Sequence, residues 1–247
     1  MGGTVSRRQF IKRVAMAGGA VAMPYLIPAS ALGRDGTVAP SNRIVMAGIG
    51  LGGRGTGDLR SWILPDPQAQ FVAICDVRRE RRDDIKAMTD KNYGNTDCKT
   101  YIDMMDVLAR PDIDAILTAT SDRLHATVSI RAMRAGKDVY TEKPASMTIA
   151  EGQAVVATAK QYGRVYQAGM QRLSEANFIV CNELLRLGRL GEVKTVYAHL
   201  APWGNVNMNR EWLPEQPLPD PHEIDWDRWL GPCPWRPFNI AYTRGGW

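Results

Sequence analysis

Four glycines stand within the six-residue run Gly48-Ile49-Gly50-Leu51-Gly52-Gly53, directly after a short apolar stretch. Glycine permits a tight turn and lets the backbone approach a bound group closely, and the start of a following helix presents free N–H groups. Both properties suit the pyrophosphate of a dinucleotide. The spacing Gly48-x-Gly50-x-x-Gly53 therefore predicts a dinucleotide-binding loop, with a plain strand–helix turn as the alternative.

An acidic residue, Asp76, follows the next expected strand and lies 26 residues after Gly50. A carboxylate in this place can accept hydrogen bonds from the hydroxyl groups of the adenosine ribose, and it would repel a 2′-phosphate. The pattern therefore favours NAD over NADP as the cofactor. Arg78 keeps NADP as an alternative, because a nearby guanidinium accommodates the additional phosphate.

A third chemically capable group is Glu142-Lys143-Pro144, which follows an expected strand at 138–140. Ligands of an open α/β sheet bind beyond the carboxyl ends of its strands, so we expect Lys143 at the edge of the site. Its ammonium group can stabilise an alkoxide or share its proton during hydride transfer. A cis peptide bond before Pro144 would fix the direction of the lysine. The alternative is a surface Glu-Lys pair without a role.

The elements that must position these residues alternate between strands and helices, which is typical of βαβ units and a parallel sheet. We expect an α/β fold, a Rossmann-type domain over residues 43–168 with helices on both faces of the sheet. Thr148 and Glu151 have the form of a capping box, so a helix should begin there. The expected strands are 43–47, 71–75, 114–118, 138–140 and 165–168, and the expected helices are 54–63, 78–91, 101–109, 125–135 and 148–162.

The pattern changes after residue 168. Residues 175–187 are amphipathic and predict a helix, and residues 191–200 alternate as in a strand with one solvated face. From 201 to 247 the chain carries eight prolines and six of its seven tryptophans, which indicates a long irregular segment. A lone strand cannot bury its own face. We therefore expect residues 169–247 to be the beginning of an α+β substrate and oligomerisation domain.

The amino terminus is predicted to be a targeting segment over residues 1–31, followed by a linker at 32–42. Arg7-Arg8-Gln9-Phe10-Ile11-Lys12 precedes an apolar stretch at 14–27, which is short for a bilayer span. Ala29-Ser30-Ala31 then has the form of a cleavage site. The pattern resembles a twin-arginine signal. We expect a periplasmic or otherwise exported protein that meets the twin-arginine machinery and loads its cofactor first, with an uncleaved membrane anchor as the alternative.

Composition argues against several other classes of protein. The net charge of +5 comes largely from residues 1–31, and the rest of the chain carries 27 basic and 26 acidic residues. No basic stripe is interleaved with aromatic residues, so we expect no nucleic-acid partner. The four cysteines are far apart and form no CxxC pair, so neither a metal site nor a redox pair is indicated.

Together these motifs resemble the glucose–fructose oxidoreductase/inositol dehydrogenase (Gfo/Idh/MocA) family. The resemblance covers roughly residues 43–200 and includes Ser121-Asp122-Arg123-Leu124-His125. It implies an NAD(P)-dependent oxidoreductase that transfers a hydride between the cofactor and a sugar or polyol. It also implies that Lys143 is catalytic, that Glu142 lies by the nicotinamide ribose and that His125 lines the cofactor pocket. The residues expected to bind the cofactor are Gly48, Gly50, Leu51, Gly52, Gly53, Asp76, Arg78, Thr120, His125, Glu142 and Lys143.

Further implications of the resemblance concern the second half of the chain. Residues 225–232 are similar to a segment of exported bacterial members, and Gln171 and Arg172 are further pocket candidates. Members also carry a catalytic segment with an Asp and a His, and nothing after Lys143 matches it. We therefore interpret the chain as C-terminally truncated from a full-length protein that would be a homo-oligomer.

Two other functions are weighed against this interpretation. One is a non-catalytic dinucleotide-binding protein or an inactive fragment of such an enzyme. The other is a short-chain dehydrogenase, which needs a Tyr four residues before a Lys on a helix. It is disfavoured because Tyr140 precedes Lys143 by only three residues, at the end of a strand.

Overall fold

The computed structural model describes residues 38–199 and 212–244. The chain divides into two units, Met1–Arg43 and Ile44–Trp247. The predicted export signal at 1–31 lies outside the described residues. In the predicted linker, the short 3-10 helix η2 spans Pro40–Asn42.

A parallel sheet of six strands organises the second unit, with the strand order β3-β2-β1-β4-β5-β6. This is the order of a Rossmann domain. All five neighbouring pairs are parallel, which confirms the predicted sheet. The strands are β1 (Ile44–Ile49), β2 (Ala69–Cys75), β3 (Lys99–Tyr101), β4 (Ala115–Thr118), β5 (Asp138–Thr141) and β6 (Tyr166–Ala168).

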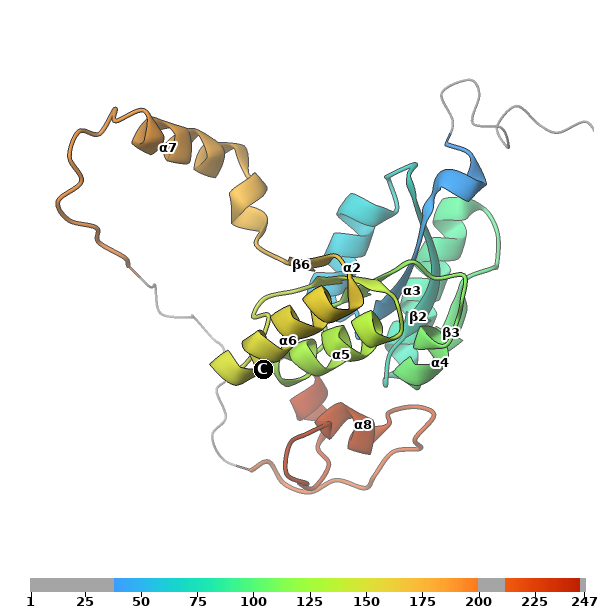
Figure 1. The fold of residues 1–247 in the computed structure, drawn as a ribbon. Coiled ribbons are helices and arrows are strands. Elements are labelled where there is room, and N and C mark those ends of the chain that lie inside the picture. Colours follow the sequence, from blue (N-terminus) through green and yellow to red (C-terminus); the bar gives the residue numbers. More distant parts are fainter. Residues whose placement is uncertain (1–37, 200–211, 245–247) are drawn as a thin grey trace, which may run out of the picture. The chain divides into compact units, whose positions relative to one another are not determined.

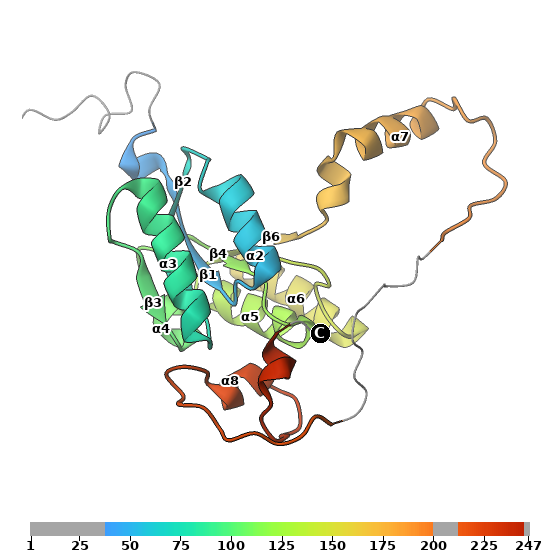
Figure 2. The ribbon, with the colours of Figure 1, turned by 180° about the vertical axis from the view of Figure 1, so that it is seen from behind.

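Helices cover both faces of this sheet, as the alternating pattern predicted. Helices α5 and α6 lie side by side on one face (Figure 1), and α2 and α3 cover the opposite face (Figure 2). The helical elements of the second unit are α2 (Gly53–Asp58), its π-helical continuation η3 (Leu59–Ile63), α3 (Arg79–Tyr93), α4 (Met104–Leu108), α5 (Asp122–Arg134), α6 (Ile149–Tyr162), η4 (Gln171–Ser174), α7 (Ala176–Arg186), α8 (Trp226–Leu230) and η5 (Ile240–Thr243).

One apolar core lies on each face of the sheet, because consecutive side chains of a strand point to opposite faces. Ile116 of β4 belongs to the core under α5 and α6, together with Val128 of α5. Its neighbour Leu117 belongs to the other core, together with Ile85 of α3. Each fully buried aliphatic side chain of this size stabilises the fold by about 1.5–3 kcal/mol. The two cores hold the strand ends, and hence the loops that follow them, in fixed positions.

Local signals set the ends of the helices on either side of β5. Helix α6 begins with the predicted capping box, in which the Thr148 hydroxyl accepts the Glu151 N–H and the Glu151 carboxylate accepts the Thr148 N–H. It ends at Gly163, and Gly136 follows α5; both have a positive φ that glycine adopts at little cost. Strand β5 ends at Thr141, so residues 142–144 lie directly beyond it.

Two expectations about strands need correction. Strand β3 at the edge of the sheet was missed, because its residues Lys99-Thr100-Tyr101 contain no apolar run. The strand expected at 191–200 is wrong for 191–199, which contain no strand, and Leu200 is not described. No residue from 176 to 199 is buried, so an alternating pattern there meets no second strand and no core. The expected helix at 175–187 is present as α7.

Residues 212–244, which we call the C-terminal segment, pack against the Rossmann domain. The segment has a small aromatic core of Trp226, Leu230 and Phe238, in which Trp226 stacks on Trp229 at 4.7 Å between ring centroids. An antiparallel bridge joins its Ile224 to Arg78. The segment, red in Figure 1, therefore adds to the domain that carries the glycine loop. No helix among the described residues has the length and apolarity needed to cross a membrane.

Candidate nucleotide-binding site

Most of the predicted site residues come together at the carboxyl edge of the parallel strands. Gly50 follows β1, Asp76 follows β2, Thr120 follows β4 and Glu142 follows β5. Strands β1 and β4 are neighbours, although β2 and β3 lie between them in the chain. Such a reversal of strand order is the topological switch point at which open α/β sheets bind their ligands.

The glycine loop turns at Gly50 and opens at the next two glycines. Gly50 has φ 66°, and a Cβ there would lie 2.2 Å from Thr120 Cγ2. Its N–H donates to the Cys75 carbonyl at 2.8 Å, which ties the turn to the end of β2. At Gly52 and Gly53 a Cβ would meet nothing within 4 Å, and both residues line a cavity. Their backbone is therefore open to an approaching phosphate.

The close-packing glycine of the loop is Gly55, which the sequence analysis missed. A Cβ at Gly55 would lie 2.7 Å from Leu51 Cδ2 and 2.8 Å from Ala119 Cβ. Close packing of helix on strand is the role expected of the third glycine in the dinucleotide-binding motif. The overlapping spacing Gly50-x-Gly52-x-x-Gly55 carries the signal that could have found it.

Two other predicted loop residues support the loop from behind. Gly48 lies within β1, where a Cβ would lie 2.5 Å from Leu51 Cδ1 and 2.9 Å from Phe71 Cζ. Leu51 itself has an exposed fraction of 0% and belongs to the core on the α3 side of the sheet. Its side chain therefore faces the core, and neither Leu51 nor Gly48 lines the cavity.

Asp76 is buried, with its Oδ1 accepting the Arg78 N–H at 2.9 Å. Burial raises the pKa of its carboxyl to about 6, and the Arg78 N–H and nearby guanidinium groups oppose that rise. Arg82 fixes the backbone at this point, because it donates to the Asp76 carbonyl at 2.7 Å and to the His222 carbonyl at 2.6 Å. At a pH above its pKa, Asp76 is a carboxylate that can accept hydrogen bonds from the ribose hydroxyl groups.

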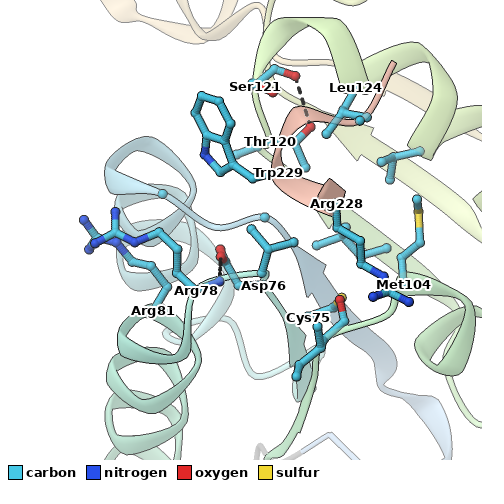
Figure 3. A pocket seen from close by; sticks show the side chains of 18 of the residues that line it. Cys75, Asp76, Arg78, Arg81, Met104, Thr120, Ser121, Leu124, Arg228 and Trp229 are labelled. Carbon is cyan, nitrogen blue, oxygen red and sulfur yellow. Dashed lines mark hydrogen bonds between the residues drawn. The ribbon is translucent and has the colours of Figure 1, made fainter. Parts of the chain in front are cut away.

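The side chain of Arg78 extends away from that of Asp76 (Figure 3). It donates to the Thr243 carbonyl at 2.8 Å and to the Glu80 carboxylate at 2.5 Å. Arg78 and Arg81 both line the cavity. The border of the site at Asp76 thus combines the carboxylates of Asp76 and Glu80 with two cations, so it leaves both NAD and NADP open as the cofactor.

Glu142 is buried and held by three donors. Its Oε1 accepts Arg54 Nε at 3.0 Å and also accepts Gln171 Nε2, and its Oε2 accepts the Lys143 N–H at 3.2 Å. Gln171 also lies 3.4 Å from the Tyr140 hydroxyl. Of the two pocket candidates after β6, Gln171 therefore touches a predicted site residue, whereas Arg172 is exposed and pairs with Glu175.

Arg54 and Asp58 complete this cluster, and the sequence analysis missed both. Arg54 pairs with Asp58 at 2.9 Å as well as with Glu142. Burial raises the pKa of Asp58 to about 6, the neighbouring Glu142 carboxylate adds to the rise, and Arg54 opposes it. Among the described residues, Asp58 Oδ2 is buried without a hydrogen-bond partner. The signal in the sequence is an Arg-Asp pair at i,i+4 spacing directly after the glycines.

Lys143 is exposed beyond β5, and its peptide bond to Pro144 is cis, as expected. His125 is buried, with Nδ1 2.6 Å from the Pro144 carbonyl oxygen and Nε2 3.0 Å from the Thr120 carbonyl oxygen. The imidazole therefore joins the loop after β4 to the loop that carries Lys143. Neither side chain lines the cavity next to Asp76.

A cavity of about 1240 Å³ lies along this edge of the sheet (Figure 3). One wall consists of the glycine loop, Asp76 and Thr120. The other comes from the C-terminal segment and was not predicted; it includes Arg228, Trp229, Tyr242, Thr243 and Arg244. Among residues 38–199 and 212–244, no group of three or more His, Cys, Asp or Glu side chains is placed to hold a metal ion.

These features fit a nicotinamide dinucleotide. The open backbone at Gly52 and Gly53 suits a pyrophosphate, and Asp76 suits the adenosine ribose. Residues 42–170 match the Gfo/Idh/MocA oxidoreductase family, which has an NAD-binding Rossmann fold. The chain belongs to this NAD(P)-binding oxidoreductase family.

Individual relatives agree with this assignment. The inositol 2-dehydrogenase of Salmonella typhimurium is 28% identical over 189 residues, which are 74% of this chain and 53% of that protein. The crystal structure of an NAD-binding protein from Listeria innocua is 26% identical, with a TM-score of 0.51 over 61% of this chain and 42% of that one. The myo-inositol 2-dehydrogenase of Lactobacillus plantarum shares the fold, with a TM-score of 0.54 at 23% identity over 61% of this chain and 43% of that one. The chain spans about half the length of the curated relatives it matches.

Proposed function

We propose that this protein is an NAD(P)-dependent oxidoreductase whose substrate is a sugar or polyol of the inositol type. The observation that carries the proposal is the convergence of Gly52, Asp76 and the Glu142-Lys143 pair at one edge of the sheet. The similarity to inositol 2-dehydrogenases supports a polyhydroxylated ring as the class of substrate.

Each group has a defined task in this proposal. The cofactor supplies a ring carbon that exchanges a hydride with a carbinol carbon of the substrate. The loop N–H groups hold the pyrophosphate, and Asp76 holds the adenosine ribose. Arg54 and Gln171 hold Glu142, which would accept hydrogen bonds from the hydroxyl groups of the nicotinamide ribose. Lys143 would stabilise the negative charge that develops on the substrate oxygen, and in the direction of carbonyl reduction its ammonium group would donate the proton that this oxygen gains.

The test is turnover of NAD and NADP with a panel of inositols and sugars, comparing the protein with its Lys143→Ala variant. Removing the ammonium group should lower kcat by about 100-fold, the lower end of what a positioned acid–base group contributes. NADH affinity, measured from the fluorescence of the bound nucleotide, should stay the same. Lys160→Ala is the matched control, because Lys160 is an exposed lysine at the end of α6.

Two results would contradict the proposal. Turnover that survives Lys143→Ala would remove the lysine from the mechanism. Tight NADH binding without turnover of any polyol would favour the alternative of a non-catalytic dinucleotide-binding protein.

We also propose that the protein is exported by the twin-arginine route with its nucleotide already bound. The support is the Arg7-Arg8 pair, the apolar stretch at 14–27 and the Ala29-Ser30-Ala31 site. Replacing both arginines by lysine should keep the protein in the cytoplasm. Export of that variant, or nucleotide-free protein in the periplasm, would contradict the proposal.

A further inference from the structure

We propose that the C-terminal segment is a working part of the nucleotide site and encloses the adenosine half of the dinucleotide. The proposal requires nucleotide binding alone and is independent of the substrate proposed above. It adds residues from 228 to 244 to a site whose predicted cofactor-binding residues run from Gly48 to Lys143.

The composition of the cavity indicates which half of the nucleotide the segment meets. Trp229 and Thr243 line the same cavity as Asp76, Ser121 and Leu124, which follow β2 and β4. Asp76 is the position that meets the adenosine ribose in a Rossmann domain. Glu142 and Lys143, predicted for the nicotinamide end, do not line this cavity. The segment therefore lies at the adenosine end, away from the reacting carbon.

Arg123 anchors the segment at the start of α5. It donates to the Leu230 carbonyl at 3.0 Å and to the Trp229 carbonyl at 2.5 Å, and its guanidinium lies 4.5 Å from the centroid of the Trp229 ring. Arg123 itself does not line the cavity. Replacing Arg123 would therefore lower nucleotide affinity by changing the position of the segment.

Further contacts hold the segment at the end of β2. The Arg79 N–H donates to the Glu223 carbonyl at 2.9 Å, and the Asp225 N–H donates to the Val77 carbonyl at 3.1 Å. Arg79 and Glu223 also form an ion pair at 2.7 Å. Val77 and Arg79 follow Asp76 closely in the chain. These main-chain bonds therefore attach the segment to the stretch of backbone that carries the ribose-binding carboxylate.

The wall formed by the segment is organised by the protein itself. Trp229 stacks on Trp226 with 12° between the ring planes, and Arg228 pairs with both Asp225 and Asp103. The side chains that would meet the adenosine are therefore already held in place, which lowers the entropy lost on binding. Leu124 and the edge of Trp229 offer an apolar surface to the purine ring.

The test compares Arg123→Ala with the unchanged protein, using AMP and nicotinamide mononucleotide as separate probes of the two halves. AMP should bind about tenfold more weakly to the variant, and NADH should leave it about tenfold faster in stopped-flow displacement, as expected for the loss of one net charge-assisted contact. Binding of nicotinamide mononucleotide should not change. Arg186→Ala is the control, because Arg186 lies on exposed helix α7 and pairs only loosely with Glu183, at 3.6 Å.

Hydrogen exchange on the unchanged protein gives a second measurement that does not depend on the variant folding. AMP should slow amide exchange in residues 226–231 and 240–244, and nicotinamide mononucleotide should not. The proposal is overturned if AMP leaves exchange in these residues unchanged. It is equally overturned if the folded variant keeps its AMP affinity, or if both probes weaken to the same extent.

Discussion

Asp76 is a buried carboxyl with a pKa of about 6, so pH determines whether the ribose meets an anion or a neutral acid. Two hydroxyl groups of a bound ribose would donate hydrogen bonds to Asp76 and so favour its ionised form. Below the pKa of Asp76, nucleotide binding therefore releases a proton from this carboxyl. NAD affinity should therefore rise between about pH 5 and pH 7 and level off above. Asp76→Asn should remove that dependence and weaken NAD binding by about tenfold at pH 7.

NADH fluorescence titrations across this pH range check the prediction. Asp84→Asn is the matched control, because Asp84 is an exposed carboxyl on the neighbouring helix α3. A pH dependence that persists in Asp76→Asn would assign the titration to a different group.

Gly50 and Gly57 give a second prediction at the scale of single residues. Gly50→Ala places a Cβ at φ 66° and 2.2 Å from Thr120 Cγ2, so it should lower the free energy of unfolding by about 2–4 kcal/mol. Gly57 lies in α2 with nothing within 4 Å of a Cβ, so Gly57→Ala should raise it by about 0.5–1 kcal/mol. Urea unfolding of both variants measures the difference, and equal effects would contradict the described loop.

Among the helices and strands, Arg54 at the start of α2 pairs with two buried carboxyl groups, Asp58 at the end of the same helix and Glu142 directly after β5. Without this cation, Asp58 and Glu142 would repel each other when both are ionised. The folded state would then hold a proton more tightly, so stability should fall as the pH rises. Arg54→Met should cost about 2 kcal/mol more at pH 8 than at pH 5.

Thermal unfolding at the two pH values measures this difference. Arg60→Met serves as the control, because Arg60 is an exposed arginine in the adjacent η3 turn. A loss of stability that is the same at both pH values would show that Arg54 acts through packing and not through its charge.

The sequence predicts five of the six strands, including the edge strand β6. Strands β1, β2 and β4 are apolar runs, because a parallel sheet between two helical layers has no solvated face. Strand β3 lies at the edge, and its polar residues left no such signal. At 191–199 the hydrophobic pattern led to a wrong prediction. Alternating apolar and polar residues indicate that one face of a strand could be buried, but they do not show whether a second strand is present to pair with it.

The residues of the candidate site also fall into those that the sequence predicts and those that it does not. The glycine loop and Asp76 could be predicted, because their roles depend on a few residues around one strand end. The Arg54–Glu142 contact and the wall around Trp229 join residues far apart in the chain, and no local pattern reports such pairs. His125 shows an intermediate case: its place after β4 was predicted, whereas its contact with the Pro144 carbonyl requires the fold.

For the whole molecule, we predict that the C-terminal segment and the Rossmann domain unfold together. Six of the seven tryptophans lie at 201–247, so tryptophan emission reports mainly on this part, whereas far-ultraviolet circular dichroism reports mainly on the helices around the sheet. Both transitions should coincide. NADH at about 100 times its Kd should raise both by roughly 5–10 °C. A separate tryptophan transition that ignores NADH would contradict joint folding.

The bond between Arg78 and Thr243 joins residues that are 165 positions apart. A ribosome delivers these two partners at very different times, and contacts of such long range form slowly. The glycine loop can fold early in synthesis, but the pocket around the adenosine can close only after residue 243 has left the exit tunnel. Nucleotide capture is then a late event that follows the synthesis of both walls of the pocket.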